Sequence, residues 1–229
     1  MPVFRLTHDI IFPPPHLAED GLLAVGGDLS RERLLLAYGN GIFPWYSEEQ
    51  PLLWWSPDPR MIITPGGFHC SRSLRRTLKQ AVFTLTMDTA FAEVINACAE
   101  VPRLGQDGTW ITPEMREAYV DLHEAGYAHS VECWREGRLA GGLYGVSLGA
   151  AFFGESMFSL ASDASKAALA RLVWQLEAWG IRLVDCQTTT PHLKRMGGRE
   201  VPRAVFLNML RKAMTHPTRQ GKWRFNEAG

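Results

Sequence analysis

The sequence predicts an α+β fold with a small irregular part at the N-terminus and a larger regular part after it. From about residue 61, the expected elements follow the order helix, three-strand meander, helix, strand, helix. The first 60 residues are instead rich in Pro, Gly and Trp, which favour turns and short extended segments. We therefore expect a small mixed domain over residues 1–60 and a second domain over residues 61–229.

In the N-terminal part, the segment Phe12–Pro15 is expected to be extended, because each proline restricts itself and the residue before it. Gly26–Ser30 reads as a turn, with Ser30 able to cap a short helix Arg31–Tyr38 that Gly39 ends. Three of the eight tryptophans follow within eleven residues. They form either a small aromatic core or a wall that stacks a base or grips an apolar side chain.

In the larger part, capping residues and turns mark the boundaries of the elements. Thr112 followed by Pro113 opens a helix, Glu136-Gly137 forms a hairpin turn, and Gly180 closes the longest helix. The expected elements are Met61–Thr64 (strand), Ser71–Lys79 (helix), Val82–Met87 (strand), Thr89–Glu100 (helix), Thr112–Gly126 (helix), His129–Trp134, Leu139–Val146 and Ala150–Met157 (strands), Asp163–Trp179 (helix), Ile181–Cys186 (strand) and Arg203–Met214 (helix). This order suits the acyltransferase fold named after the N-acetyltransferases.

The bulk composition is that of an ordinary globular protein, with 46% hydrophobic and 21% charged residues. No apolar stretch follows Met1, and no window approaches the roughly 20 apolar residues that span a bilayer. The four cysteines form no C-x-x-C pair, which favours buried, reduced thiols over disulfides or a zinc site. We expect a cytoplasmic protein that binds no metal.

A basic stripe stands out although the formal net charge is zero. Arg72, Arg75, Arg76 and Lys79 are spaced three and four apart, so they share one face of the expected helix. No acidic residue lies between Pro59 and Met87 to balance them. The stripe is either a solvated surface or a site for phosphates, and the pattern favours the two equally.

Polar residues on two apolar strands are the main candidates for chemistry. Strand alternation predicts that Phe153, Glu155 and Met157 share one face, and that Asp185 and Gln187 share another. If the two strands are neighbours, two carboxylates and an amide meet beside large apolar side chains. Burying carboxylates is costly without partners, so the set is either a satisfied structural network or an active centre.

Several common catalytic arrangements are missing. The sequence has no Gly-x-Ser-x-Gly motif, and no pairing of Cys with His follows from spacing. His192 is expected to be a surface residue. Ser159–Lys166 lacks the Gly-x-Gly spacing that cradles a pyrophosphate, so the acyl donor is not expected to be acetyl-CoA.

Over most of its length, the sequence resembles the leucyl/phenylalanyl-tRNA–protein transferase family. The likeness runs from about Phe12 to Phe206 and rests on long motifs in a fixed order. These are Gly21–Asp28, Gly41–Trp45, Leu53–Arg60, Ser71–Ser73, Gly108–Thr112, Ala128–Glu132, Phe153–Ser159, Ala164–Lys166 and Asp185–Gln187. One departure is Lys194-Arg195, where small residues are expected in relatives.

The resemblance implies an enzyme that moves Leu or Phe, with Met as a candidate third donor, from aminoacyl-tRNA to a protein. The acceptor is the α-amine of an N-terminal Arg or Lys, and the product is marked for degradation. It implies no metal or organic cofactor and no membrane partner, and we expect a monomer. Two alternatives remain open: a peptidoglycan-type aminoacyl-tRNA transferase, disfavoured by the short chain, and a non-catalytic RNA-binding module.

The resemblance also suggests roles for residues. Asp185 would orient Gln187 and attract the ammonium or its proton, Gln187 would contact the amine or the reacting carbonyl, and Glu155 would help hold the cationic acceptor residue. Phe153, Met157, Leu169 and Leu143 are candidates for the donor side-chain pocket, with plain core packing as the alternative. Trp110 and Tyr119 would stack on the terminal adenosine, and the basic stripe would hold tRNA phosphates.

Overall fold

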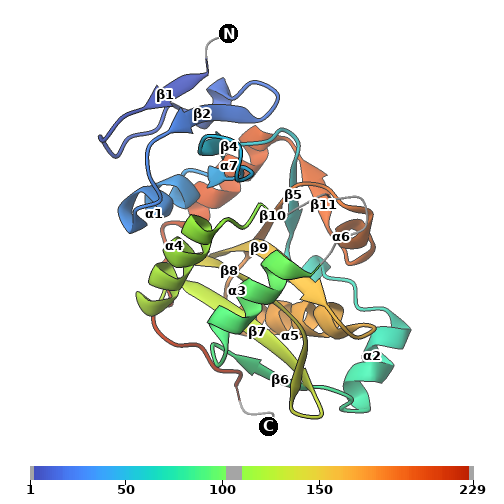
Figure 1. The fold of residues 1–229 in the computed structure, drawn as a ribbon. Helices are drawn as coiled ribbons and strands as arrows, with labels where there is room; N and C mark the ends of the chain where they lie inside the picture. The colour runs from blue at the N-terminus through green and yellow to red at the C-terminus, as the bar shows by residue number, and fades with distance from the viewer. Residues whose placement is uncertain (1–2, 102–109, 227–229) are drawn as a thin grey trace.

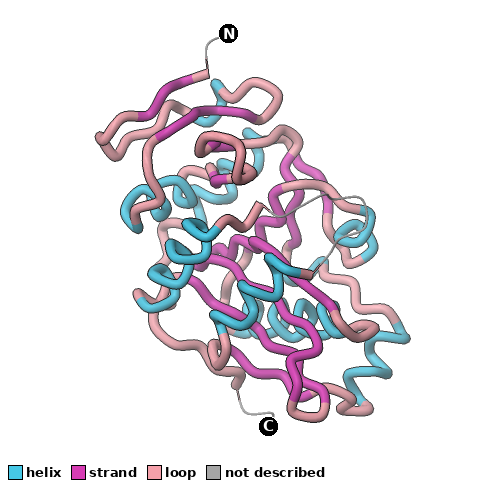
Figure 2. The backbone as a smooth tube through the Cα atoms, viewed as in Figure 1, coloured by secondary structure: helices cyan, strands magenta, loops and turns pink. Residues whose placement is uncertain are grey.

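The protein is described by a computed structural model that covers residues 3–101 and 110–226. Two sheets organise these residues (Figure 1, Figure 2). The smaller sheet has the order β1-β2-β4-β3, with strands Phe4–Leu6 (β1), Leu22–Gly26 (β2), Phe43–Pro44 (β3) and Leu53–Trp55 (β4). The larger has the order β11-β5-β10-β9-β8-β7-β6, with strands Arg60–Ile63 (β5), Thr84–Met87 (β6), Ala128–Arg135 (β7), Arg138–Leu148 (β8), Ala151–Ser159 (β9), Leu183–Gln187 (β10) and Arg199–Val201 (β11).

Helices cover both faces of the larger sheet, which separates two apolar clusters. One cluster joins the N-terminal part to the helices Phe91–Glu100 (α3), Pro113–Glu124 (α4) and Arg203–Ala213 (α7). The other lies under the helices Ala164–Ala178 (α5) and Arg72–Lys79 (α2). The α-helices are Arg31–Gly39 (α1), Arg72–Lys79 (α2), Phe91–Glu100 (α3), Pro113–Glu124 (α4), Ala164–Ala178 (α5), Pro191–Arg195 (α6) and Arg203–Ala213 (α7). Two single 3₁₀ turns, Pro15–Leu17 and Pro65–Gly67, complete the described helical elements.

The fold is therefore a mixed α/β arrangement, and most expected elements of the larger part form within a few residues of their predicted bounds. The three-strand meander is present as β7-β8-β9, all antiparallel, and Thr112 caps α4 by accepting a bond from the Met115 N–H. Ser30 is the N-cap residue of α1, as expected, but its side chain makes no capping hydrogen bond. The expected loop Arg103–Trp110 falls outside the described residues except for Trp110.

One strand pair determines where the functional site lies. Strands β9 and β10 run parallel, whereas every other described pair of the larger sheet is antiparallel. Their pairing extends from Leu183 opposite Ala151 to Asp185 opposite Phe153 and then stops. Both strands continue beyond this point without pairing to each other, so the sheet opens between Glu155 and Gln187.

Candidate active site

A cavity of about 490 Å³ lies where β9 and β10 separate. Side chains from the N-terminal part, the larger sheet, α5 and α6 all contribute to its wall. The lining residues are Phe43, Pro44, Trp45, Trp110, Leu143, Tyr144, Phe152, Gly154, Glu155, Ser156, Met157, Leu169, Leu172, Val184, Cys186, Gln187, Thr188, Thr190, His192 and Leu193. A volume of this size is typical of a small-molecule site.

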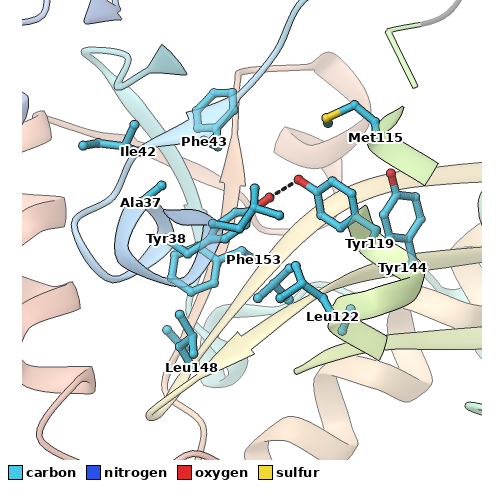
Figure 3. Close-up of a cluster of buried hydrophobic side chains, with 14 of the residues drawn as sticks. Ala37, Tyr38, Ile42, Phe43, Met115, Tyr119, Leu122, Tyr144, Leu148 and Phe153 are labelled. Atoms are coloured by element: carbon cyan, nitrogen blue, oxygen red, sulfur yellow. Dashed lines mark hydrogen bonds between the residues drawn. The ribbon is translucent and has the colours of Figure 1, made fainter. Parts of the chain in front are cut away.

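A β-bulge at Glu155 changes which residues of β9 face the cavity. Tyr144 pairs with Ser156 and the next residue, Gly145, pairs with Gly154, so Glu155 is an extra residue without a partner across the ladder. The expected common face of Phe153 and Met157 was therefore wrong. Phe153 packs on the ring of Tyr38 in the opposite cluster (Figure 3). Met157 instead lines the cavity.

Phe152 takes the place in the cavity wall that the sequence assigned to Phe153. It lines the cavity with Leu143, Leu169 and Met157, three of the candidates for the donor pocket, and Leu172 and Val184 join them. Strict alternation from Glu155 could not have found Phe152, because the bulge shifts the pattern by one residue. The result is an apolar chamber between the sheet and α5.

Asp185 lies at the end of the β9–β10 pairing and is fully buried. The Arg60 guanidinium donates two hydrogen bonds to its carboxylate, from Nε to Asp185 Oδ1 at 2.8 Å and from Nη2 to Asp185 Oδ2 at 2.6 Å. The Arg60 guanidinium carbon also lies 4.8 Å and 4.5 Å from the ring centres of Phe43 and Phe206. Asp185 is thus held as one half of a buried ion pair, away from the cavity wall.

Gln187 adopts a backbone conformation that is unusual for a residue with a side chain. Its φ is +61°, and the register of β10 against β5 jumps from Asp185 to Gln187. The Gln187 N–H donates to Asp185 Oδ1 at 2.9 Å, and its Nε2 donates to Glu155 Oε1 at 2.8 Å. Asp185 therefore fixes the backbone that directs the Gln187 amide toward Glu155.

Glu155 is buried and bonded through both oxygens. Gln187 donates to Oε1, and the hydroxyl of Tyr119 donates to Oε2 at 3.0 Å. Burial raises the pKa of Glu155 to about 7, and the hydrogen bonds from Tyr38 and Tyr119 oppose that shift. The Tyr38 and Tyr119 hydroxyls are themselves hydrogen-bonded to each other, which links α1 to the site (Figure 3).

Tyr119 cannot stack on a ligand in this structure, contrary to the expectation from the sequence. Its side chain is fully buried, its ring meets Tyr144 edge-on at 5.6 Å, and its hydroxyl contacts only interior groups. Burial raises the pKa of the Tyr119 phenol, so it stays a neutral donor to Glu155. Trp110, by contrast, is half-buried and lines the cavity, as does Trp45, which is 39% exposed.

The basic stripe forms on α2 as expected. Ser71 caps the helix by accepting a bond from the Leu74 N–H, and only Leu74 of the helix is fully buried. The four cations of the stripe are exposed, and none forms an ion pair with a described residue. They are Arg72, Arg75, Arg76 and Lys79. All four therefore lie on one exposed face of α2.

Comparison with known proteins adds a second line of observation. Residues 62–211 match the model of the leucyl/phenylalanyl-tRNA protein transferase family, and residues 27–58 match the model of its N-terminal domain. The chain belongs to this family. A protein named leucyl/phenylalanyl-tRNA–protein transferase from Myxococcus xanthus is 58% identical, with 97% of each chain covered. One of the same name from Anaeromyxobacter dehalogenans is 59% identical, with 100% of this chain and 99% of the other covered.

Membership of the transferase family confirms the resemblance drawn from the motifs and identifies the chain as an aminoacyltransferase. Solved structures overlap only loosely. L-PGS from Bacillus licheniformis has a TM-score of 0.41 at 11% identity, covering 73% of this chain and 53% of that one. A GCN5-related N-acetyltransferase from Kribbella flavida also has a TM-score of 0.41, at 13% identity, covering 74% and 59%.

Across residues 3–101 and 110–226, no cluster of three or more His, Cys, Asp or Glu side chains is arranged to hold a metal ion. Within the same ranges, no helix is both long and apolar enough to cross a membrane.

Sequence reasoning missed Arg60 and Tyr38 as members of the site. Arg60 ends the motif Leu53–Arg60, and a buried Asp185 requires a cation, so the pair could have been sought among the motif residues. Tyr38 carried no such signal, because it lies on a short helix 81 residues away from its partner Tyr119.

Proposed function

We propose that this chain transfers Leu or Phe from aminoacyl-tRNA to the α-amine of proteins that begin with Arg or Lys. The observation that carries the proposal is an apolar chamber which ends at the buried Glu155–Gln187 pair. A Leu, Phe or Met side chain would fill the chamber, leaving its ester carbonyl near the polar end. Trp110 and Trp45, at the wall of the same cavity, offer rings for the terminal adenosine.

The reaction needs little beyond positioning. The neutral amine attacks the ester carbonyl carbon, a C–N bond forms, and the C–O bond to the ribose breaks. The ribose oxygen finally receives the proton that the amine loses. An α-amine has an ordinary pKa near 7.7–8.0, so a useful fraction is already neutral near neutral pH, and holding the two reactants together supplies much of the rate.

The described contacts support a division of roles within the polar end. Gln187 would direct the amine or the carbonyl, since its amide lies in the cavity wall. Asp185 would act as a positioning residue through Arg60 and the Gln187 backbone, because its own side chain has no exposure. Glu155, with a pKa raised to about 7 by burial, would attract the cationic acceptor and relay its proton.

The wider arrangement follows the same proposal. Residues 1–60, which carry the smaller sheet, would form the N-terminal domain, and residues 61–229 an N-acetyltransferase-like catalytic domain. The parallel β9–β10 pair inside an otherwise antiparallel sheet supports an N-acetyltransferase-like fold for the second domain. The proposal further takes the protein to act as a monomer in the cytoplasm on protein and tRNA, with the exposed α2 stripe on tRNA phosphates.

One assay tests the transfer. Leucyl-tRNA labelled on Leu is mixed with a peptide that begins with Arg, and with the same peptide beginning with Asp as the matched control. We expect acid-stable labelled product from the first peptide alone. Equal labelling of both peptides would contradict the acceptor preference, and labelling of neither would contradict the proposed function.

A further inference from the structure

Residues 214–226, which follow α7, are anchored against the larger sheet and form neither helix nor strand. Within this segment, Trp223 is only 2% exposed. Its backbone N–H donates to Asp88 Oδ2 at 2.6 Å, and its indole N–H donates to the Arg219 carbonyl at 2.9 Å. The indole also meets Trp179 edge-on at 4.8 Å. So many specific contacts fix the position of this one ring.

A buried pair of polar side chains provides the anchor. His129 Nδ1 lies 2.8 Å from Asp88 Oδ2, and the His129 ring stacks on Trp223 at 3.6 Å with an angle of 6° between the planes. Asp88 Oδ1 accepts a further bond from the Ser130 N–H at 2.9 Å. Neither Asp88 nor His129 lines the cavity, so the reaction proposed above makes no use of them.

Trp223 is nevertheless connected to the cavity through Phe152. The two ring centres are 6.1 Å apart, and Phe152 is a lining residue that is only 1% exposed. The Phe152 ring also lies against Gly145, where an added Cβ would meet its Cζ at 2.6 Å. The backbone of Gly145 blocks movement of the Phe152 ring on one side, and the contact with Trp223 limits its movement on another.

We infer that Trp223 is a specificity-determining positioning residue: it holds Phe152 in place and so sets the size of the chamber for the donor side chain. This inference rests on the proposed function, because it takes the chamber as the site of the aminoacyl side chain. Trp223 itself touches no substrate. Its effect comes through its ring contact with the lining residue Phe152.

The test compares donors of increasing size. Leucyl-, phenylalanyl- and tryptophanyl-tRNA are each used with the Arg-initiated peptide, by the wild type and by Trp223→Ala. Freeing Phe152 lets the chamber enlarge, so kcat/KM for the tryptophanyl donor should rise relative to the leucyl donor by about tenfold, the usual scale for a small change in an apolar pocket. Trp223→Phe keeps a ring on His129 and should restore most of the wild-type ratio.

Phe225→Ala is the matched control. Phe225 lies two residues further along, and its ring packs under the Arg171 guanidinium at 5.0 Å, so this variant also disturbs the segment. Its donor ratio should match that of the wild type. An equal fall for all three donors in Trp223→Ala would overturn the inference, because it would mean that the ring only stabilises the fold.

Two measurements keep the test decisive. If Trp223→Ala fails to fold, Asp88→Asn weakens the anchor but retains the indole, and should move the ratio in the same direction by a smaller factor. Binding of non-hydrolysable leucyl- and phenylalanyl-adenosine amides gives a ratio without catalysis. Absence of transfer by the wild type would then count against the proposed function alone, whereas an unchanged binding ratio in the variants would refute the role of Trp223.

Discussion

Arg60 and Asp185 form two parallel hydrogen bonds in the protein interior, where neither side chain is more than 1% exposed. The pair joins β5 to β10 at the position where β10 stops pairing with β9. Asp185 Oδ1 also accepts the Gln187 N–H, so the ion pair stabilises the left-handed conformation that aims the Gln187 amide at Glu155. The buried charges therefore lie behind the site, and the amide they position faces the cavity.

Removing one partner of this pair should affect stability and activity together. Arg60→Met leaves Asp185 as an uncompensated buried charge, which typically costs about 3–5 kcal/mol of unfolding free energy. The double variant Arg60→Met, Asp185→Leu should recover most of that loss, since an apolar pair of similar volume needs no charge compensation. Urea unfolding of the two variants measures this difference.

The double variant separates the two roles of the pair. It should stay inactive although it folds, because Gln187 has lost the carboxylate that fixes its backbone, and a displacement of about 1 Å can cost about 100-fold in rate. Wild-type kcat/KM in a folded double variant would show that Asp185 contributes only to stability.

Tyr119→Phe should change the pH dependence of transfer. The Tyr119 hydroxyl donates to Glu155, and this bond lowers the pKa of a carboxyl that burial raises to about 7. Losing the donor removes stabilisation of the ionised form, so the pKa should rise further, by roughly one unit if the bond contributes about 1.4 kcal/mol. If transfer needs ionised Glu155, the acidic limb of the profile of kcat/KM against pH moves to higher pH.

Tyr46→Phe offers a control for that experiment. Tyr46 is another of the buried tyrosines, and its hydroxyl bonds to Thr112 at 3.2 Å instead of to Glu155. The acidic limb of kcat/KM against pH for Tyr46→Phe should coincide with that of the wild type. If both variants shift the limb alike, the Tyr119–Glu155 bond is not the cause.

The raised pKa of Glu155 also has a consequence for stability. Between an unfolded pKa near 4.3 and the folded value of about 7, the native state holds more protons than the unfolded chain, so this residue makes stability fall as pH rises. Glu155→Gln removes that contribution. Relative to the wild type, its unfolding free energy should therefore increase between pH 5 and pH 8, by up to about 3 kcal/mol. Urea unfolding at the two pH values measures the change, and a constant difference would contradict a buried, titrating Glu155.

How far the sequence predicted the site depends on local backbone regularity. The α5 helix and the meander have long periodic patterns, and their position is close to that expected. Alternation failed at Glu155, where a single extra residue reversed the faces of Phe153 and Met157. Bulges of this kind depend on the neighbouring strand, so a pattern read along one strand does not reveal them. The strands β1 and β11 have three residues each, too few to display a period.

Met157 and Phe153 provide a direct test of the corrected faces. Met157→Ala enlarges the cavity and should change the ratio of Phe to Leu transfer. Phe153→Ala removes a ring that packs on Tyr38 in the opposite cluster, and should cost about 3–5 kcal/mol of unfolding free energy. Its donor ratio should stay near that of the wild type. A changed donor ratio in Phe153→Ala together with an unchanged ratio in Met157→Ala would contradict the bulge and support simple alternation along β9.

Charge reversal on α2 tests the tRNA-binding role of its exposed cations. Arg72→Glu with Arg76→Glu should weaken use of whole aminoacyl-tRNA and reduce its salt dependence, because each lost phosphate contact lowers the slope of log affinity against log salt by about 0.7–0.9. A minimal donor, an aminoacyl-adenosine, has no distant phosphates, so the variant should use it as the wild type does. Arg135→Glu and Arg138→Glu, on the exposed β7–β8 turn, make a control of equal charge change. If this control lowers tRNA use and salt dependence as much as the α2 variant does, the effect comes from overall charge and the stripe is only a solvated surface.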